Sequence, residues 1–447
     1  MAESSVDTPP WLPAGLAAAF AELPHAAAGH TDDGPLGGTG SAEALDRARR
    51  RSGGDEAVHT GLIRVGATEA VVGSFDFRFF GGSVGTAAGA RIEQAFRYSR
   101  ETRLPLVTMI ASGGSRMQEG MPALLQLQRI AAAAQRNRLA GVPHLAVLRD
   151  PATGGMWASL GAGADVVLAV DGAQVGFAGR RVRPPEDLDD PAYTAAGQYA
   201  HGHVDEIVHE GQLAVALGAW LALLRPAAGA PEPAELPRAL GTATLPTDGW
   251  SAVRQARRPE RPRGAAYLAD HFDTLRLLSG DRAGGVDPGM LCGIGLRGGR
   301  PIAFAAQTGT ATTPAGFRTA ARLVRLADRL ALPVLTLVDT PGAANDAAAE
   351  RAGVGPAIAE LFGTVAAARV PVTTLVIGEG GSGGALALAA PGRTWIAPDA
   401  YFSVIAPELA AAILKRDPSQ VPATADQLRL RPQDLVALGV VRGVVTP

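Results

Sequence analysis

An internal repeat is the sequence feature that most constrains the fold. Leu332 follows Leu104 by 228 positions (332 − 104), and each opens the same pattern of a Leu-Pro step, an apolar run and a Gly-rich turn. The same spacing joins Val142-Pro143 to Val370-Pro371, Gly155 to Gly383 and Asp171 to Asp399. A spacing that persists over this much chain indicates two consecutive copies of one structural unit.

Within each copy, apolar runs alternate with segments of helical periodicity. Short continuous apolar runs are typical of strands buried on both faces, and strands that alternate with helices form parallel sheets. We expect strands at residues 106–111, 145–148, 334–338 and 373–377, and helices at residues 88–100, 122–137, 317–329 and 357–368. The sequence therefore predicts an α/β fold of two tandem domains related by an internal duplication.

The repeat and the composition between its copies also set domain boundaries. A helix is expected near Leu16–Leu23 and another near Trp250–Arg257. Gly-, Ala- and Pro-rich stretches lie before and between the two copies. The predicted organisation is a poorly structured N-terminal extension (1–54), a first domain (55–225), a Pro-rich linker (226–263) and a second domain (264–447).

Composition excludes several classes of protein. The 447 residues carry a formal net charge of -2, which argues against a general nucleic-acid binder. One cysteine, Cys292, makes neither an internal disulfide nor a Cys-based zinc site, and we expect it to be a small core residue. No signal peptide is recognised in Met1–Pro10, and apolar runs such as Leu213–Leu224 are too short to span a membrane. We expect a cytoplasmic, soluble protein.

Four Gly-rich turns follow the four expected strands, and they are the candidate functional features. Glycine allows a positive φ and a close approach of the backbone to a ligand, and amides at a helix start can stabilise an oxyanion. Glycines can also serve only tight packing, but four turns in two repeat-related pairs favour function. The turns are Ser112-Gly113-Gly114-Ser115-Arg116, Thr153-Gly154-Gly155-Met156, Thr340-Pro341-Gly342-Ala343 and Gly378-Glu379-Gly380-Gly381-Ser382-Gly383-Gly384.

Other chemistries are weaker alternatives. Gly380–Gly384 matches the G-x-S-x-G nucleophile elbow of α/β-hydrolases, but that fold needs a histidine after the serine, and all eight histidines precede Ser382. His201 and His203 lack an evident third ligand, so no metal site is expected. Arg180–Arg183 could contact phosphates or form a solvated face.

At these turns the chain resembles the bacterial acetyl-CoA carboxylase carboxyltransferase, from about residue 55 to the end. The first copy resembles its β subunit and the second its α subunit. The β-like motifs are Phe80–Gly85, Ser112–Glu119, Asp150–Gly155 and Gly176–Gly179, and the α-like motifs are Ala252–Arg257, Leu278–Arg282, Asp339–Ala343, Ile377–Ala385 and Tyr401–Glu408.

The resemblance implies a crotonase-like fold in each half and carboxyl transfer from N-carboxybiotin to the α-carbon of an acyl-CoA, without a protein base. It implies a thioester oxyanion held by the first half and a biotin ureido oxygen held by the second. The implied donors are Gly113, Gly114, Gly154 and Gly155, and Gly342, Ala343, Gly383 and Gly384. The implied acyl-CoA contacts are Gly81, Gly82, Ser112, Arg116, Met156, Phe177, Gly179 and Arg180, and the implied biotin contacts are Pro341, Gly380, Gly381 and Ser382.

The resemblance also implies partners. The only lysine, Lys415, does not stand between methionines as the biotinylated lysine of carriers does, so biotin would arrive on a biotin carboxyl carrier protein served by a biotin carboxylase. A homodimer or higher homo-oligomer is expected, with sites between β-like and α-like halves.

Departures from the family pattern keep other activities open. The four-cysteine zinc ribbon of the β subunit is not present, and the loops at Ala306–Thr313 and Ala343–Asp346 differ from the usual α-subunit sequence. A biotin-independent decarboxylase of malonyl-type thioesters and a non-catalytic scaffold of a carboxylase complex are the two alternatives.

Overall fold

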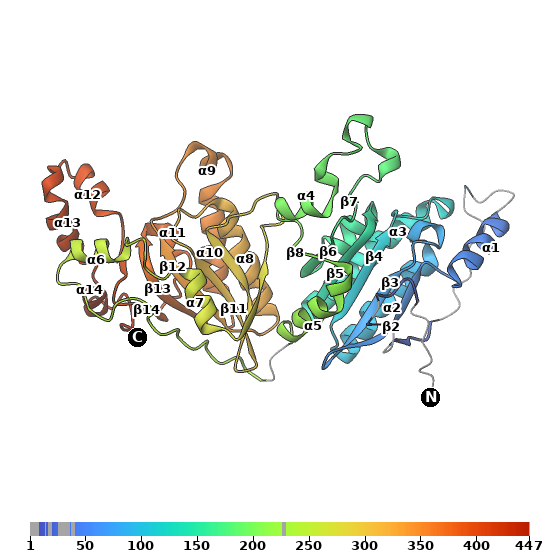
Figure 1. Ribbon diagram of the computed structural model, residues 1–447, viewed down its shortest axis with the longest axis horizontal. Helices are drawn as coiled ribbons and strands as arrows, with labels where there is room; N and C mark the ends of the chain where they lie inside the picture. Colours follow the sequence, from blue (N-terminus) through green and yellow to red (C-terminus); the bar gives the residue numbers. More distant parts are fainter. Residues whose placement is uncertain are drawn as a thin grey trace. The chain divides into compact units, whose positions relative to one another are not determined.

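The computed structural model describes residues 9–13, 15–16, 20–25, 36, 41–225 and 229–446. The chain forms two compact units, Met1–Arg225 and Pro226–Pro447, drawn from blue to green and from yellow-green to red in Figure 1. Each unit is an α/β unit with its own sheet and its own hydrophobic core. Over the described ranges, no helix is both long and apolar enough to cross a membrane.

The described part of the first unit contains an eight-stranded sheet in the order β1-β2-β3-β4-β5-β6-β8, with β7 beside β5. Strands β1 to β3 pair antiparallel, and the remaining pairs are parallel. The strands are β1 (Ala21–Glu22), β2 (Val58–Val65), β3 (Thr68–Phe75), β4 (Leu106–Ser112), β5 (His144–Thr153), β6 (Val166–Val170), β7 (Val175–Gly176) and β8 (Glu206–Val208). The α-helices are α1 (Ser41–Ser52), α2 (Thr86–Thr102), α3 (Met121–Leu139), α4 (Ala195–Ala200) and α5 (Leu213–Leu223).

The described part of the second unit contains a seven-stranded sheet in the order β14-β13-β12-β11-β10-β9, with β15 beside β13. Strands β9 to β11 pair antiparallel and the rest parallel. The strands are β9 (Thr274–Leu278), β10 (Met290–Arg297), β11 (Arg300–Gln307), β12 (Val334–Thr340), β13 (Val372–Gly381), β14 (Thr394–Ile396) and β15 (Tyr401–Ser403). The α-helices are α6 (Gly249–Ala256), α7 (Gly264–His271), α8 (Pro314–Arg329), α9 (Ala347–Arg351), α10 (Val354–Ala367), α11 (Ser382–Leu386), α12 (Pro407–Ile413), α13 (Val421–Gln427) and α14 (Pro432–Ala437).

The two sheets share the same register at their centres. In the first unit, β4 and β5 pair from Leu106 opposite His144, and the register shifts before Ser112 pairs with Ala152. In the second unit, β12 and β13 pair from Val334 opposite Val372, and the register shifts before Thr340 pairs with Gly380. Every one of these positions is displaced by 228 (334 − 106, 380 − 152), so the predicted duplication is confirmed down to the irregularity before the turns.

The helices that cover the sheets also repeat. Helix α2 packs against α3 and against β2 and β3, while α8 packs against α10 and against β10 and β11. Apolar residues at helical spacing on α2, such as Ile92 and Phe96, are fully buried in the first core. The four helices expected from the sequence are present as α2, α3, α8 and α10, with ends within a few residues of the expected ones.

Two segments outside the copies differ from their expected character. The described residues Ala21–Glu22, inside the segment expected to be helical, form a strand that pairs with β2; residues 17–19 of that segment lie outside the described residues. The Pro-rich segment 229–263 packs on the second unit, because Ala234 is buried in its core and α6, the expected helix near Trp250, packs against α13. Apolar side chains within this Pro-rich segment explain why it packs there.

Candidate active site

In the first unit, the two Gly-rich turns touch. Gly114 adopts a φ of +111° and Gly154 a φ of +67°, and a Cβ atom on Gly154 would lie 3.1 Å from the Cα atom of Gly114. The Ser112 hydroxyl fixes the first turn, because it donates to the Gly82 carbonyl at 2.7 Å and accepts from the Gly114 amide at 3.0 Å. The Gly113–Gly114 and Gly154–Gly155 steps, whose amides the resemblance implies as oxyanion donors, thus lie next to each other in this unit.

The second unit builds the equivalent turn with the same bonds. The Thr340 hydroxyl donates to the Thr310 carbonyl at 2.7 Å and accepts from the Gly342 amide at 3.1 Å. Gly384 lies so close to the facing turn that a Cβ atom on it would stand 2.8 Å from the carbonyl carbon of Gly342. Residues 340, 342 and 310 match residues 112, 114 and 82 of the first unit at the repeat spacing.

Several amides predicted as oxyanion donors are already bonded within the protein. The Gly113 amide donates to the Gly81 carbonyl at 2.9 Å, and the Gly154 amide donates to the Phe177 carbonyl at 3.0 Å. The Gly114 and Gly342 amides donate to the hydroxyls described above. Because a bonded N–H group has little left to offer a ligand, these four glycines shape the turns and are not free donors.

Open amides remain at matching positions of the two units. In the described part of the chain, the amides of Ser115 and Gly155 donate to no protein acceptor, and neither do those of Ala343 and Gly383. Ser115 and Ala343 are 228 positions apart, as are Gly155 and Gly383. Ser115 was missed in the sequence, although the repeat spacing from Ala343 points to it. Each unit therefore presents one pair of N–H groups suited to a developing oxyanion.

Ser382 has the backbone of a strained turn without the surroundings of a nucleophile. Its φ is +55°, in the left-handed region that glycine favours, and Gly154 at the equivalent position has a φ of +67°. No hydrogen bond to its hydroxyl is found in the part of the chain that the structure describes. The conformation belongs to the repeated turn, which argues against the hydrolase alternative.

Some expected acyl-CoA contacts are exposed and others are not. Phe177 is 72% exposed, and Arg180 is exposed and pairs with Asp189 at 3.2 Å. Met156 is fully buried in the core. Gly82 is buried too, and it lies so close to Ala111 that a Cβ atom on it would clash with the Ala111 backbone.

The prediction that Arg116 contacts acyl-CoA does not fit the structure. Arg116 is 3% exposed and forms a buried ion pair with Glu56, with a second contact to Glu119 at 3.2 Å. Its guanidinium also donates to the Ser83 carbonyl at 2.8 Å. Arg116 is therefore committed to holding the turn that follows β4, because a buried guanidinium needs buried partners.

The glycines expected to contact biotin serve packing in part. Gly380 and Gly381 end β13 beside β15, and a Cβ atom on Gly380 would lie 2.7 Å from the Phe402 ring. A Cβ atom on Gly381 would meet the backbone of Pro341. A Cβ atom on Gly383, by contrast, would face open space, so this part of the turn is accessible to a ligand.

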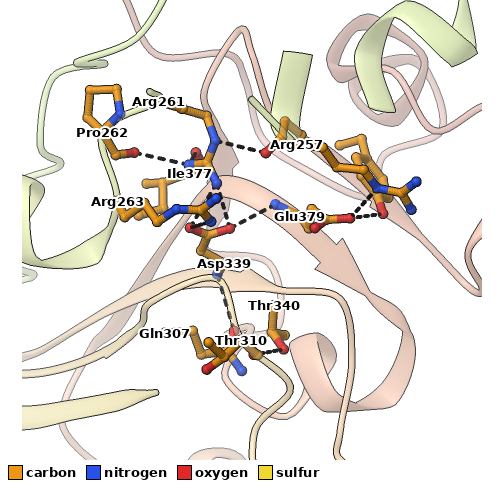
Figure 2. A network of polar contacts seen from close by, with 12 residues as sticks. Arg257, Arg261, Pro262, Arg263, Gln307, Thr310, Asp339, Thr340, Ile377 and Glu379 are labelled. Atoms are coloured by element: carbon orange, nitrogen blue, oxygen red, sulfur yellow. Dashed lines mark hydrogen bonds and ion pairs between the residues drawn. The ribbon is translucent and has the colours of Figure 1, made fainter. Parts of the chain in front are cut away.

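A network of charges around the buried Asp339 lies next to the turns of the second unit (Figure 2). Asp339 has no exposed surface, and Arg261 binds both of its carboxylate oxygens at 2.8 and 2.9 Å. Arg257 binds Glu379 at 2.7 Å and also pairs with Glu408. Burial by itself lowers the pKa of Arg257, but the hydrogen bonds to Glu408 and Glu379 outweigh burial and raise that pKa above its ordinary value.

No alternative chemistry emerges near the turns. In the described ranges, no group of three or more His, Cys, Asp or Glu side chains is placed to hold a metal ion. Cys292 is buried, and burial raises the pKa of its thiol to about 12, so it stays a protonated core residue. At the turns, the arrangement offers backbone donors to a ligand.

Comparisons with known proteins identify the family of the chain. The family model described as acetyl co-enzyme A carboxylase carboxyltransferase-like matches residues 243–447, and the carboxyl transferase domain model matches residues 34–185. The acetyl-coenzyme A carboxylase carboxyl transferase subunits beta/alpha of Salinispora tropica are 42% identical over 424 residues, covering 90% of this chain and 75% of the relative. The probable biotin-dependent acyl-coenzyme A carboxylase beta3 subunit of Mycobacterium tuberculosis is 35% identical over 414 residues, covering 90% and 82%.

Solved structures support the fold. Transcarboxylase 12S, with hydrolysed methylmalonyl-coenzyme A bound, superimposes with a TM-score of 0.76 at 21% identity, covering 96% of this chain and 84% of that one. A single-chain, multi-domain long-chain acyl-CoA carboxylase gives a TM-score of 0.74 at 20% identity, covering 96% and 43%. The fold is that of tandem crotonase-like domains, and the chain belongs to the carboxyltransferase family of acetyl- and acyl-CoA carboxylases, with its β-like half first and its α-like half second.

Proposed function

We propose that this carboxyltransferase moves a carboxyl group from N-carboxybiotin, held on a separate carrier protein, to the α-carbon of an acyl-CoA. The observation that carries the proposal is the duplicated pair of open amides, Ser115 with Gly155 and Ala343 with Gly383. The reaction develops negative charge on two carbonyl oxygens, one on the thioester and one on the biotin ureido group. Two equivalent donor pairs match that requirement.

The first unit would hold the acyl-CoA. Ser115 and Gly155 would donate to the thioester oxygen as the enolate forms, and the bonded glycines Gly113, Gly114 and Gly154 would keep the two amides in place. Loss of one oxyanion donor typically costs about 10²–10³ in rate, so the pair accounts for a large part of the catalysis. Phe177 and Arg180, both exposed, are among the expected acyl-CoA contacts that are compatible with the structure.

The second unit would hold biotin. Ala343 and Gly383 offer open amides, and the space in front of Gly383 leaves room for the ureido ring. Bound N-carboxybiotin would supply both the carboxyl group and the base for the α-proton. The chain itself then needs only to bind, orient and polarise the reactants, which fits turns built from backbone donors.

A homo-oligomer would bring the two kinds of half together. Met117, Met121, Leu124 and Leu125 are exposed directly after the Gly114 turn of the first unit. In the second unit, Leu409, Ile413 and Leu414 are exposed on and next to α12. Such apolar surface is typical of sites that another protein covers, so we expect a second copy to cover it and to place a β-like half against an α-like half.

The test is an incorporation assay. The chain is combined with a biotin carboxylase, a biotin carboxyl carrier protein, ATP and labelled bicarbonate, and labelled product is measured over acetyl-, propionyl-, butyryl- and longer acyl-CoAs. Carrier-dependent incorporation into at least one acyl-CoA is expected. No incorporation into any of them would overturn the proposal.

Two further measurements separate the alternatives. Release of CO₂ from a malonyl-type thioester without biotin or carrier would assign a decarboxylase. Binding of carboxylase partners without either reaction would assign a scaffold.

A further inference from the structure

The segment 257–263, which precedes the repeated part of the second unit, reaches into the turns of that unit through three arginines (Figure 2). Arg261 and Arg263 bind Asp339, which directly precedes the Thr340-Pro341-Gly342 turn, with Arg263 at 3.4 Å. Arg257 binds Glu379, which lies between Gly378 and Gly380 near the end of β13. Both Gly-rich turns of the unit are thus attached to one segment.

Arg261 uses its whole guanidinium group in this attachment. Its side chain is 2% exposed, and its donors reach the Ala256 carbonyl at 2.9 Å, the Ile377 carbonyl at 2.8 Å and the carbonyl of Pro262 at 3.0 Å. The remaining terminal nitrogen binds both oxygens of Asp339. Gly378 is required by this pair, because a Cβ atom there would collide with Asp339 and Arg261.

A short chain of bonds connects Asp339 to the open amides. The Asp339 carboxylate accepts the Glu379 amide at 3.1 Å, and its own amide donates to the Gln307 side chain at 3.2 Å. Gln307 in turn donates to the Gly384 carbonyl at 3.2 Å and to the Thr312 hydroxyl at 3.0 Å. Thr312 pairs with the backbone beside Ala343. The network therefore braces the residues on both sides of Ala343, and also Gly384 next to Gly383.

The first unit shows that the turn itself does not need these charges. Ala111 stands where the second unit has Asp339, and Pro151 stands where it has Glu379, yet the strand register and the turn bonds are the same. A buried ion pair is seldom more stable than apolar residues of similar volume. Stability alone is therefore a weak reason for a fully buried Arg–Asp pair at this point.

We infer that Arg261 and Asp339 are positioning residues for the biotin-side amides of Ala343 and Gly383, an inference that rests on the proposed function. They act through the backbone and do not touch the reactants. An error of about 1 Å in the placement of a donor can cost on the order of 100-fold in rate. The pair would fix the positions of the Ala343 and Gly383 amides more precisely than the strand pairing alone does.

The experiment uses the full chain in the reverse reaction, from a carboxylated acyl-CoA to free biotin. Arg261→Lys keeps the charge but loses the two-point contact, and Asp339→Asn removes the charge. We expect each variant to lower kcat/KM for biotin by 10- to 100-fold and to change KM for the acyl-CoA by less than twofold. Arg369→Lys, at an exposed ion pair with Asp328, is the matched control with unchanged kinetics.

The double variant Arg261→Met with Asp339→Ala separates positioning from folding. It removes both charges and places alanine at position 339, as the first unit has at Ala111. Thermal stability should therefore return close to that of the unaltered chain, while kcat/KM for biotin stays at least 10-fold low. Recovery of activity together with stability, or an equal change in KM for both substrates, would overturn the inference. An unaltered chain without any carboxyl transfer would instead overturn the proposed function.

Discussion

The two units share the same backbone turn but hold it with different ion pairs. In the first unit the support comes from the turn itself, since Arg116 follows Gly114 and pairs with Glu56 and Glu119. In the second unit it comes from outside the repeat, since Arg261 reaches Asp339 across 78 positions of sequence. The backbone geometry was thus kept in both copies while the side chains behind it diverged, which is expected if each copy serves a different reactant.

The largest expected difference between the units concerns the buried carboxylates. Asp339→Ala leaves Arg261 buried without the carboxylate it binds, and we expect a loss of about 3–5 kcal/mol in the free energy of unfolding. Glu56→Ala should cost less, because Glu119 still pairs with Arg116. Denaturant unfolding of both variants measures the difference. Equal losses of stability would show that Glu119 does not compensate for the missing Glu56.

The next comparison uses position 384 and its counterpart Met156. The first unit accommodates a buried methionine there, whereas a methyl group on Gly384 would press on the backbone of Gly342 and Ala343. We expect Gly384→Ala to lower kcat by about 10²–10³-fold, the typical effect of a lost oxyanion donor. Steady-state kinetics measure it. Gly363→Ala on α10, where a Cβ atom meets nothing within 4 Å, is the control, and an equal loss in both variants would exclude a specific effect.

Acid should weaken the first unit through its buried histidines. Burial lowers the pKa of His144 to about 4 and that of His59 to about 4, from an ordinary value of 6.5. Between these values the unfolded chain binds protons that the folded chain does not, so stability falls as the pH drops from about 6.5 towards 4. His144 alone should account for about 2 kcal/mol by pH 5.

Thermal unfolding at pH 7 and pH 5 checks this expectation. His144→Gln should reduce the dependence on pH. The second unit has one buried histidine with a similarly lowered pKa, His271. A second unit that lost as much stability as the first would argue against histidine burial as the cause.

The smallest expected effect concerns the position that has a positive φ in both turns, Ser382 in one and Gly154 in the other. Ser382 occupies a φ of +55° where the first unit has Gly154, so Ser382→Gly should stabilise the chain by about 1 kcal/mol. The reverse change, Gly154→Ser, should destabilise it, because its Cβ atom would approach the Gly113 carbonyl oxygen to 3.3 Å. Unfolding curves measure both. A loss of activity beyond 1000-fold in Ser382→Gly would revive the nucleophile hypothesis.

The sequence allowed the repeated part of the fold to be predicted, because buried strands, Pro turns and Gly-rich turns recur at one spacing. The resemblance to the family implied Gly155, Ala343 and Gly383 as donors, and these three are among the open amides. Which amides are free was harder to predict, since the Ser112 and Thr340 hydroxyls bond two of the expected donors. Such bonds depend on the geometry of a turn and leave no periodic signal.

Ion pairs between residues far apart in the sequence could not be predicted either. Arg116 was expected to bind acyl-CoA because it stands in a family motif, yet its partner Glu56 lies 60 positions away. Arg261 was placed in a linker, because its segment is rich in proline. Only the structure shows that Arg261 binds Asp339.

The register shift that both sheets share before their turns has a consequence for how the enzyme can change. Strands β4 and β5, like β12 and β13, are buried and fully paired up to that shift, so a drift of the backbone in one turn would require many ladder bonds to be remade. Substitutions that change what each turn binds are then confined to the loops and side chains around that turn. The ligand contacts of the first unit and those of the second should accordingly be separable traits, open to redesign one at a time.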